Sequence, residues 1–441
     1  MRSTVWPGGE SGNADGQRNR TDSERGKVIM MVCPLRRPQH RMYLAAFLLD
    51  FSVAVGFTAM PFFVIQQLNG GAALSGTVGA VQMAVYAFAC LASAAMLSRA
   101  RNPLVWAVGG VLGFAVVFTL VPWVRSPGLC IVVASAPFLG LALAWPAMQA
   151  WLGLEPDPEI RARRLAGFNT ATAFGFTLSP LLTGPLYDAD FRLPFALLTV
   201  LSLAVAGLVL SLAPRNPRIS PAPRDERHHE ETASRNVTPG LLYASWAATF
   251  TANGLFAAVR SVYPLRVETL AAEGSLLFFP GIRPAFFDAL GPATAYSWLA
   301  FTLSLWTVIC FAIMGRTSAW QGRYALLAAG QMAAALAFVL LSCARSVTVM
   351  AACFAVVGFN YGLCFFASIY YSLAHARTRH RNAAINEGVL GAGGFAGGLA
   401  FGHLAEAIGV PAAFQYAPLL AAAAIGVQLL LLRTGPRRPQ S

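Results

Sequence analysis

Three ionisable side chains stand inside long apolar stretches of this sequence: Asp50, Arg260 and Glu387. A charge stranded in hydrocarbon costs several kcal/mol, so such residues usually face the interior of a helical bundle or a polar pathway through it. A carboxyl group can take up and release a proton, and a guanidinium can bind an anion. The three residues are therefore candidates for ion coupling or for substrate recognition inside an apolar body.

The two carboxyl groups lie at different predicted depths. Asp50 is eight residues past Met42, or roughly 12 Å into its span. It is interpreted either as a coupling or substrate residue or as a buried carboxyl hydrogen-bonded between helices. Glu387 is about four residues into its span, at roughly 6 Å. This shallow position favours an interfacial carboxylate at a helix N-terminus, where the helix dipole stabilises negative charge.

Arg260 lies near one end of its predicted span. An arginine in this position can extend its guanidinium to the membrane interface while its alkyl chain stays in lipid. The second interpretation is that Arg260 binds an anionic substrate in the outer cavity. The sequence leaves both interpretations open.

Neutral polar residues add to the candidates for substrate recognition. Gln82 and Tyr86 share one helix face at a spacing of four residues. The other candidates are Gln149, Asn169, Asn253, Asn360, Tyr361 and Asn386. Each alone is typical of a hydrogen bond between helices. Together some of them must line the pathway, because a transport route needs polar groups.

These residues must be positioned by membrane-spanning helices. Of the 441 residues, 56% are apolar and only 12% are charged, and the mean hydropathy is +0.57. Stretches of about twenty apolar residues are long enough to cross the hydrocarbon core. The predicted spans are 42–67, 73–97, 103–124, 128–152, 165–187, 193–213, 240–264, 290–314, 322–343, 347–373, 383–405 and 411–432. The predicted fold class is therefore an all-α membrane protein with two bundles of six helices.

Arginine in every second loop predicts the orientation. The arginine-rich loops contain Arg99, Arg161, Arg163, Arg164, Arg316, Arg323, Arg379 and Arg381. We therefore expect both termini to be cytoplasmic and the protein to lie in a bacterial cytoplasmic (inner) membrane. The net charge of +13 fits an anionic inner leaflet better than nucleic acid, and we expect no nucleic-acid partner.

The polar segments divide the chain into five parts. Residues 1–41 are expected to be a disordered cytoplasmic tail, and 433–441 a second tail. The bundles 42–213 and 240–432 are joined by 214–239, which reads as a flexible cytoplasmic linker. The loop 265–291 is unusually long and apolar enough to lie on the membrane surface or to cover the cavity.

The two halves repeat each other at an offset of 218 residues. The matched pairs are Gly140 and Gly358, Arg161 and Arg379, Arg163 and Arg381, Gly175 and Gly393, Gly184 and Gly402, and Asp188 and Glu406. In the same register, Asn169 is the counterpart of Glu387. Parallel six-helix repeats are a known transporter plan.

The fifth span carries Gly167, Gly175, Ser179-Pro180 and Thr183-Gly184. With the repeated halves, this pattern resembles the Major Facilitator Superfamily over about residues 42–432. The glycines and prolines resemble the antiporter motif of the family, in which Ser179 and Thr183 would be glycines. Leu49-Asp50-x-Ser52 resembles the first-span aspartate of its drug-efflux members. The resemblance implies a secondary transporter of the efflux branch that works by alternating access.

Other family motifs depart from the pattern. The loop Met96–Arg101, which includes Arg99, lacks the acidic residue with which the family latches its halves, and its counterpart around Arg316 is degenerate. Many proton-coupled efflux members carry an arginine where this chain has Ala136. Uniport therefore stays open beside ion-driven export.

Small residues are the candidates for the moving contacts. Gly394, Gly398 and Gly402 recur every four residues on one helix face and permit close backbone approach. Gly175, Pro180 and Gly184 are the candidates in the fifth span, where proline can kink the helix.

The sequence contains no catalytic cluster, no nucleotide-binding loop and no zinc-ligand spacing. We therefore predict no enzyme activity, no catalytic residue, no metal and no cofactor. The expected partners are a small-molecule substrate, a coupling proton or other ion, and the lipid bilayer, with the protein itself monomeric. The alternatives are uptake of a sugar or metabolite, and a transporter-like sensor or scaffold that does not transport.

Overall fold

The computed structural model describes residues 37–98, 100, 102–153, 158–213, 238–282, 290–373 and 379–433. Within them the chain forms twelve long helical segments. The first six are α2 (Pro38–Phe62) continued by η2 (Phe63–Gln67), α3 (Ala72–Ser98), α4 (Pro103–Leu120) with η3 (Val121–Trp123), α5 (Pro127–Ser135) with α6 (Pro137–Gly153), α7 (Pro158–Ala189) and α8 (Leu193–Leu210). The other six are α9 (Pro239–Ser261), α11 (Pro292–Arg316), α12 (Tyr324–Cys343), α13 (Val347–Leu373), α14 (Arg379–Ile408) and α15 (Val410–Phe414) with α16 (Ala417–Arg433).

The prediction of an all-helical membrane protein with twelve spans is confirmed. Ten of the described helices are each long and apolar enough to cross a membrane. The other two, α7 and α9, carry more Gly, Ser, Thr and Asn than their neighbours. Residues 1–36, 214–237 and 434–441, which hold most of the predicted tails and linker, lie outside the described residues.

Three predicted helix starts are late by four to seven residues. Helix α2 begins at Pro38 and not at 42, so residues 38–41, predicted as part of a disordered tail, are helical. Helix α7 begins at Pro158 and α14 at Arg379, before the predicted starts at 165 and 383. The arginines assigned to these loops therefore lie in the first turns of helices. Arginine is a good helix former, and proline is favoured at the first helical position, so the helices continue beyond their apolar parts.

The sequence also marks where several helices begin. Helices α4 and α9 start with a proline. The first N–H groups of a helix have no intrahelical partner, so proline, which lacks an N–H, loses no hydrogen bond at this position. The preceding side chains cap the next free N–H groups. Asn102 accepts from Leu104 N at 3.1 Å, and Thr238 accepts from Leu241 N at 3.3 Å.

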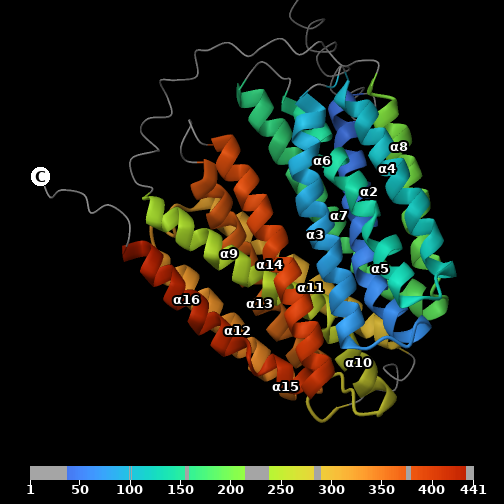
Figure 1. Cartoon of the computed structure of the whole chain (residues 1–441), viewed down its shortest axis with the longest axis vertical. Helices are drawn as coiled ribbons and strands as arrows, with labels where there is room; N and C mark the ends of the chain where they lie inside the picture. The colour runs from blue at the N-terminus through green and yellow to red at the C-terminus, as the bar shows by residue number, and fades with distance from the viewer. Residues whose placement is uncertain are drawn as a thin grey trace, which may run out of the picture.

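The helices form two halves that lie side by side (Figure 1). Helices α2 to α8 pack on one another, as do α9 to α16, and the main contacts between the halves join α3 to α14 and α7 to α11. We call the end at which Asp188 and Glu406 lie the closed end, and the end at which Arg316 and Arg433 lie the wide end. In Figure 1 the halves meet near α10 and α15, at the closed end, and diverge toward the other.

The segment between α9 and α11, predicted as a long apolar loop, contains a helix of its own. Helix α10 (Tyr263–Ala272) follows α9 directly at the closed end. Beyond it, Leu277 N donates to Arg345 O at 2.8 Å, and Val347 N donates to Leu277 O at 2.9 Å. These bonds attach the segment to the start of α13. Residues 283–289 are outside the described part of the chain.

Helices α4, α8, α12 and α16 present exposed apolar side chains to the outside. Examples are Val116, Val200, Leu336 and Leu430, each about 60% exposed or more. An apolar surface of this extent would associate in water, whereas lipid solvates it without cost. These four helices therefore form the lipid-facing flanks of the bundle, and the polar candidate residues are carried mostly by the other helices.

Within each half, glycine allows helices to touch through their backbones. A Cβ added to Gly110 of α4 would lie 2.3 Å from the carbonyl oxygen of Gly140, and one added to Gly140 of α6 would lie 2.2 Å from that of Gly110. Since real Cβ contacts are never this short, α4 and α6 can keep this spacing only with glycine at both positions.

Gly110→Ala is expected to destabilise the protein, because the extra methyl group forces the two helices apart at a cost of about 1–3 kcal/mol. Gly113→Ala on the same helix is the matched control, since a Cβ there meets nothing within 4 Å. Thermal unfolding of detergent-purified protein should show a lower Tm for the first variant and an unchanged or higher Tm for the second. Equal Tm values would contradict the contact.

Candidate functional site

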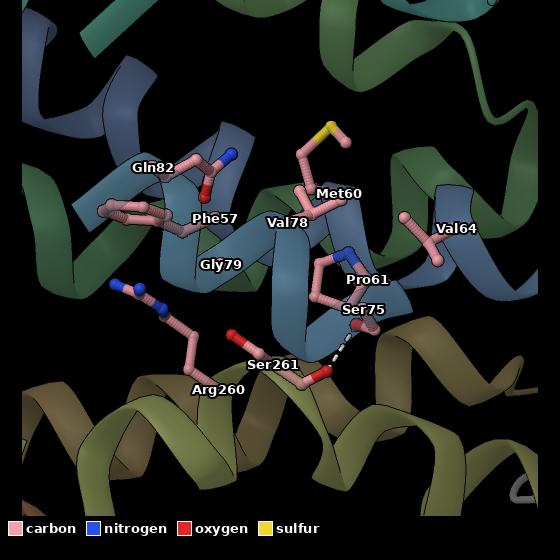
Figure 2. Close-up of a pocket in the computed structure, with 10 residues that line it drawn as sticks. All are labelled: Phe57, Met60, Pro61, Val64, Ser75, Val78, Gly79, Gln82, Arg260 and Ser261. Carbon is pink, nitrogen blue, oxygen red and sulfur yellow. Dashed lines mark hydrogen bonds between the residues drawn. The ribbon is translucent and has the colours of Figure 1, made fainter. Parts of the chain in front are cut away.

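Two cavities lie between the halves, and Arg260 lines both. The first is bounded by α2, α3 and the end of α9 (Figure 2). The second is bounded by α2, α7, α9 and α11. The first is lined by Phe57, Met60, Pro61, Val64, Ser75, Val78, Gly79, Gln82, Arg260 and Ser261. The second is lined by Ala54, Phe57, Thr58, Phe176, Pro180, Phe256, Arg260, Tyr296, Ala300, Leu303 and Ser304.

The Arg260 side chain crosses from the second half to the first. Figure 2 shows it extending from α9 toward Phe57 and Gln82. Its guanidinium carbon lies 3.9 Å from the centre of the Phe57 ring and 5.9 Å from that of Phe256. The Tyr296 hydroxyl donates to the carbonyls of Val259 and Arg260, both at 3.2 Å, and holds this end of α9. Of the two interpretations of Arg260, the geometry matches the cavity and not the membrane interface.

The charge of Arg260 is only partly balanced by its surroundings. Among the described residues, no carboxylate forms an ion pair with it. A cation over an aromatic face gains about 0.5–2 kcal/mol, and a cation in the last turn of a helix gains about 0.3–1 kcal/mol. Removing an ion from water costs several kcal/mol. An anion in either cavity would supply the missing compensation.

Asp50 is buried near the middle of its helical segment. It lies twelve residues past Pro38, or roughly 18 Å along the axis. Trp145 of α6 forms a side-chain hydrogen bond to the carboxyl group. The Trp145 ring packs edge-on against Tyr86 of α3, with ring centres 5.8 Å apart. Asp50 therefore contacts a neighbouring helix, and its coupling role stays a prediction.

The predicted position of Glu387 at the N-terminus of its helix is wrong. Because α14 begins at Arg379, Glu387 lies two turns inside the helix, roughly 12 Å from its start. The helix dipole acts within the first turn, so it does not account for a carboxylate at this depth. Glu387 is half-buried and forms no ion pair with any described residue.

Two tyrosines lie near the three ionisable residues. The Tyr86 hydroxyl lies within electrostatic range of both Asp50 and Glu387. The Tyr361 hydroxyl lies within range of both Glu387 and Arg260. The sequence predicted all five residues separately, whereas the fold arranges them in one series between the halves.

The six neutral candidates other than the two tyrosines fall into two groups. Four are buried. Gln82 donates to Ala134 O at 3.1 Å, and Asn253 donates to Leu390 O at 2.5 Å. Asn360 accepts from Cys364 Sγ at 3.5 Å, and Asn386 accepts from the Ser368 hydroxyl. Gln149 and Asn169 are exposed instead. Of all six, only Gln82 lines either cavity.

Two carboxylates hold the halves together at the closed end. Asp188 of the first half accepts from Ala293 N at 3.2 Å and Thr294 N at 2.8 Å, at the start of α11 in the second half. Glu406 of the second half accepts from Ala73 N at 3.2 Å, at the start of α3 in the first. Each repeat thus places its matching acid on a helix N-terminus of the other, where negative charge is favoured.

Glycines beside these acids bring the backbones of the two halves together. A Cβ on Gly402 of α14 would lie 2.9 Å from Ala72 O and 2.9 Å from Gly76 Cα on α3. A Cβ on its repeat counterpart, Gly184 of α7, would lie 2.6 Å from Ala293 O on α11. The predicted repeat pair therefore forms equivalent contacts on opposite sides of the closed end.

The other candidates for conformational change are dispersed. Gly398 packs on Gly76 and Ala80 between the halves, and Gly394 on Met83 and Asn253. Gly175 packs on Phe47 within the first half, and Pro180 lines the second cavity. Arg316 is exposed at the wide end. Arg99 lies outside the described residues.

Sequence reasoning missed several residues of the site. Phe57, Thr58 and Trp145 are ordinary members of apolar helices, and nothing in their spacing separates them from core or lipid-facing positions. A polar pair at the closed end was missed as well: Gln66 Nε2 donates to Glu268 Oε2 at 3.0 Å. Glu268 lies on α10, inside the segment taken for a loop, so its partner could not be predicted.

Comparison with known proteins assigns the family. The sequence profile of the Major Facilitator Superfamily matches residues 42–281, more than half of the chain. The chain belongs to this superfamily. No curated protein matches it in sequence. As a major facilitator it is a secondary transporter and not an enzyme.

Solved major facilitators share the fold at low sequence identity. The POT family transporter PepTSo has a TM-score of 0.71 at 14% identity, over 90% of this chain and 98% of that one. An inward-facing, unoccupied bacterial homologue of the human lysosomal transporter Spinster has a TM-score of 0.69 at 14% identity, with coverage of 90% and 98%. The nucleoside transporter NupG has a TM-score of 0.67 at 12% identity, again over 90% and 98%. The comparisons support the superfamily and no particular branch of it.

The combination of Asp188→Asn and Glu406→Gln is expected to open the closed end of this major facilitator. Each exposed carboxylate at a helix N-terminus contributes about 0.3–1 kcal/mol, so losing both shifts the conformational equilibrium by about threefold to thirtyfold. Spin labels at the exposed residues Ser126 and Tyr416, on opposite halves in a cysteine-free background, should report a longer distance.

Asp190→Asn is the matched control, because Asp190 accepts from Arg192 N at 2.8 Å within its own half. An unchanged distance distribution in the double variant would show that the acids do not hold the closed end.

Glu268 should make closure depend on pH. Burial raises the pKa of Glu268 above its ordinary value, Gln66 opposes that shift, and the charge of Asp188 adds to it. In the closed arrangement Glu268 therefore binds a proton more tightly than it would in water, so a fall in pH favours closure through this group. Glu268→Gln should remove this contribution. Spin-label distances measured against pH would check the difference, and identical profiles would contradict it.

Proposed function

We propose that this major facilitator moves a small organic molecule across a bacterial cytoplasmic membrane by alternating access. In this proposal the halves rock about a binding site that lies between them. The observation that carries it is the pair of cavities lined by both halves, with Arg260 at their junction. Rocking would expose such a site to one side of the membrane and then to the other.

The proposed orientation places the wide end in the cytoplasm. Both the predicted arginine-rich loops and the described arginines support it, since Lys and Arg near span ends favour the cytoplasmic side. At the wide end the chain carries Arg163, Arg164, Arg316, Arg323, Arg381 and Arg433, whereas the closed end carries Arg125, Arg192, Arg266 and Arg345. On this orientation the structure is the inward-facing state, and both termini are cytoplasmic.

The proposed direction is export driven by an ion gradient. Support for export comes from the antiporter-like residues Gly175, Pro180 and Gly184 of α7. Support for coupling comes from Asp50 and Glu387, two carboxyl groups that no described residue neutralises. A proton is the ion that such groups exchange. The transporter would act as a monomer, because each chain contains a complete pair of halves.

Flux into liposomes of known orientation tests the proposal. Purified protein should exchange a labelled substrate for the unlabelled compound in counterflow, and an imposed proton gradient should drive net movement from the wide end to the closed end. Asp50→Asn should abolish the gradient-driven movement while counterflow continues. Net movement in the other direction would favour uptake, and absence of flux for every compound that binds would favour a sensor or scaffold.

A further inference from the structure

We propose that the space around Arg260 binds a small organic monocarboxylate with an aromatic or branched apolar body. The inference names the substrate class of the site described above, so it rests on the proposed function where it identifies the bound compound as the transported one. The binding site itself stands on geometry alone.

The first argument is charge. Arg260 is the only charged residue among the described residues that line the two cavities. Its guanidinium lies over Phe57 and has no carboxylate partner in the described chain. A planar guanidinium presents several N–H donors in a fixed fork, which matches the two oxygens of a carboxylate. A single positive charge in an apolar enclosure favours a single negative charge on the ligand.

The second argument is a hydroxyl group that the fold leaves unused. Thr58 of α2 lines the second cavity beside Arg260. Its side chain is 5% exposed, and no hydrogen bond from its hydroxyl occurs within the described residues. The other hydroxyls of this cavity are occupied: Ser304 donates to Ala300 O at 3.0 Å, and Tyr296 donates to the end of α9. Thr58 can therefore donate to the same anion as Arg260.

The third argument is the origin of the two donors. Thr58 belongs to the first half and Arg260 to the second, and both bound the same cavity. A carboxylate held by both would bridge the halves. The bound carboxylate would therefore have different affinities for the open and closed arrangements. A ligand can shift the equilibrium between two arrangements only if its affinities for them differ.

The fourth argument is the apolar wall. Phe57, Phe176 and Phe256 surround the guanidinium side of the second cavity, and Ala54, Ala300 and Leu303 complete it. Phe57 packs against Phe176 at a ring-centre distance of 6.2 Å, so this wall is continuous. Aromatic and aliphatic walls stabilise an apolar body and do not hydrate an inorganic anion. The positive charge of Arg260 disfavours an organic cation.

A binding assay on the full-length protein in detergent tests the site. The probes are benzoate, phenylacetate and isovalerate, each beside its neutral amide, with phenethylamine and sulfate as the cationic and inorganic probes. We expect at least one carboxylate to raise the Tm and to bind at least tenfold more tightly than its amide, phenethylamine or sulfate.

The variants assign that affinity to residues. Arg260→Gln should weaken carboxylate binding at least tenfold, Arg260→Lys should weaken it less, and the near-isosteric Thr58→Val should weaken it several-fold. Arg345→Gln is the matched control, because it removes the same charge from an exposed residue that lines neither cavity. If Arg260→Gln fails to fold, Arg260→Lys and Thr58→Val still test the site.

Three results would overturn the proposal: no carboxylate binds, an amide or sulfate binds as tightly as the carboxylates, or Arg260→Gln and Thr58→Val leave binding unchanged. The transport function fails separately. Carboxylate binding that depends on Arg260, with no counterflow in liposomes, would refute transport and keep the site. Counterflow of a neutral compound at full rate in Arg260→Gln would refute the site and keep transport.

Discussion

A charged or polar group between these helices has no water to bind. Either the protein supplies a partner for it, or the group stays unpaired and can bind a ligand. Most polar groups of the interior obey the first rule. Asn253 and Gln82 donate to backbone carbonyls of neighbouring helices, and the Asp50 carboxyl is hydrogen-bonded by Trp145. Arg260 and Glu387 follow the second. Their positions between the halves, and not their chemistry alone, support the proposed functional region.

At the closed end, the two repeats satisfy unpaired polar groups in the same way. Helices α3 and α11 each begin there with free N–H groups, which must find acceptors. Glu406 and Asp188 supply those acceptors from the opposite half. Because the contact depends on the halves being together, it stabilises one arrangement without fixing it permanently. Glycine at 184 and 402 brings the backbones close enough for the acids to reach.

The two cavities and the closed end are coupled through short stretches of the same helices. On α9, Arg260 is followed at once by Ser261, whose carbonyl accepts from Ser75 of α3. On α11, Tyr296 holds the end of α9, only two residues after Thr294 contacts Asp188. In the proposed alternating access, a change in how the halves meet at the closed end would therefore reach the groups that surround Arg260 through these short connections.

Much of the fold could be predicted from the sequence, because hydropathy and helix length are local properties. The twelve spans, the repeat offset and the pairing of Asp188 with Glu406 are all present in the order of residues. The predicted starts of α7 and α14 are too late. The run of apolar residues ends at the edge of the lipid, whereas the helix continues beyond that edge. That error in turn placed Glu387 at the start of its helix, whereas it lies two turns inside it.

The tertiary structure alone decided which way each residue faces. Several of these helices are apolar around most of their circumference, so no amphipathic pattern fixes their rotation, and packing against distant helices sets it instead. The sequence could name Arg260 as a candidate, but only packing turned it over Phe57 and beside Thr58. It could pair two acids by their spacing, but only the meeting of the halves placed each on a helix of the other. Composition determined that this chain crosses a membrane, whereas contacts between residues far apart in sequence determined where the two cavities lie and which side chains line them.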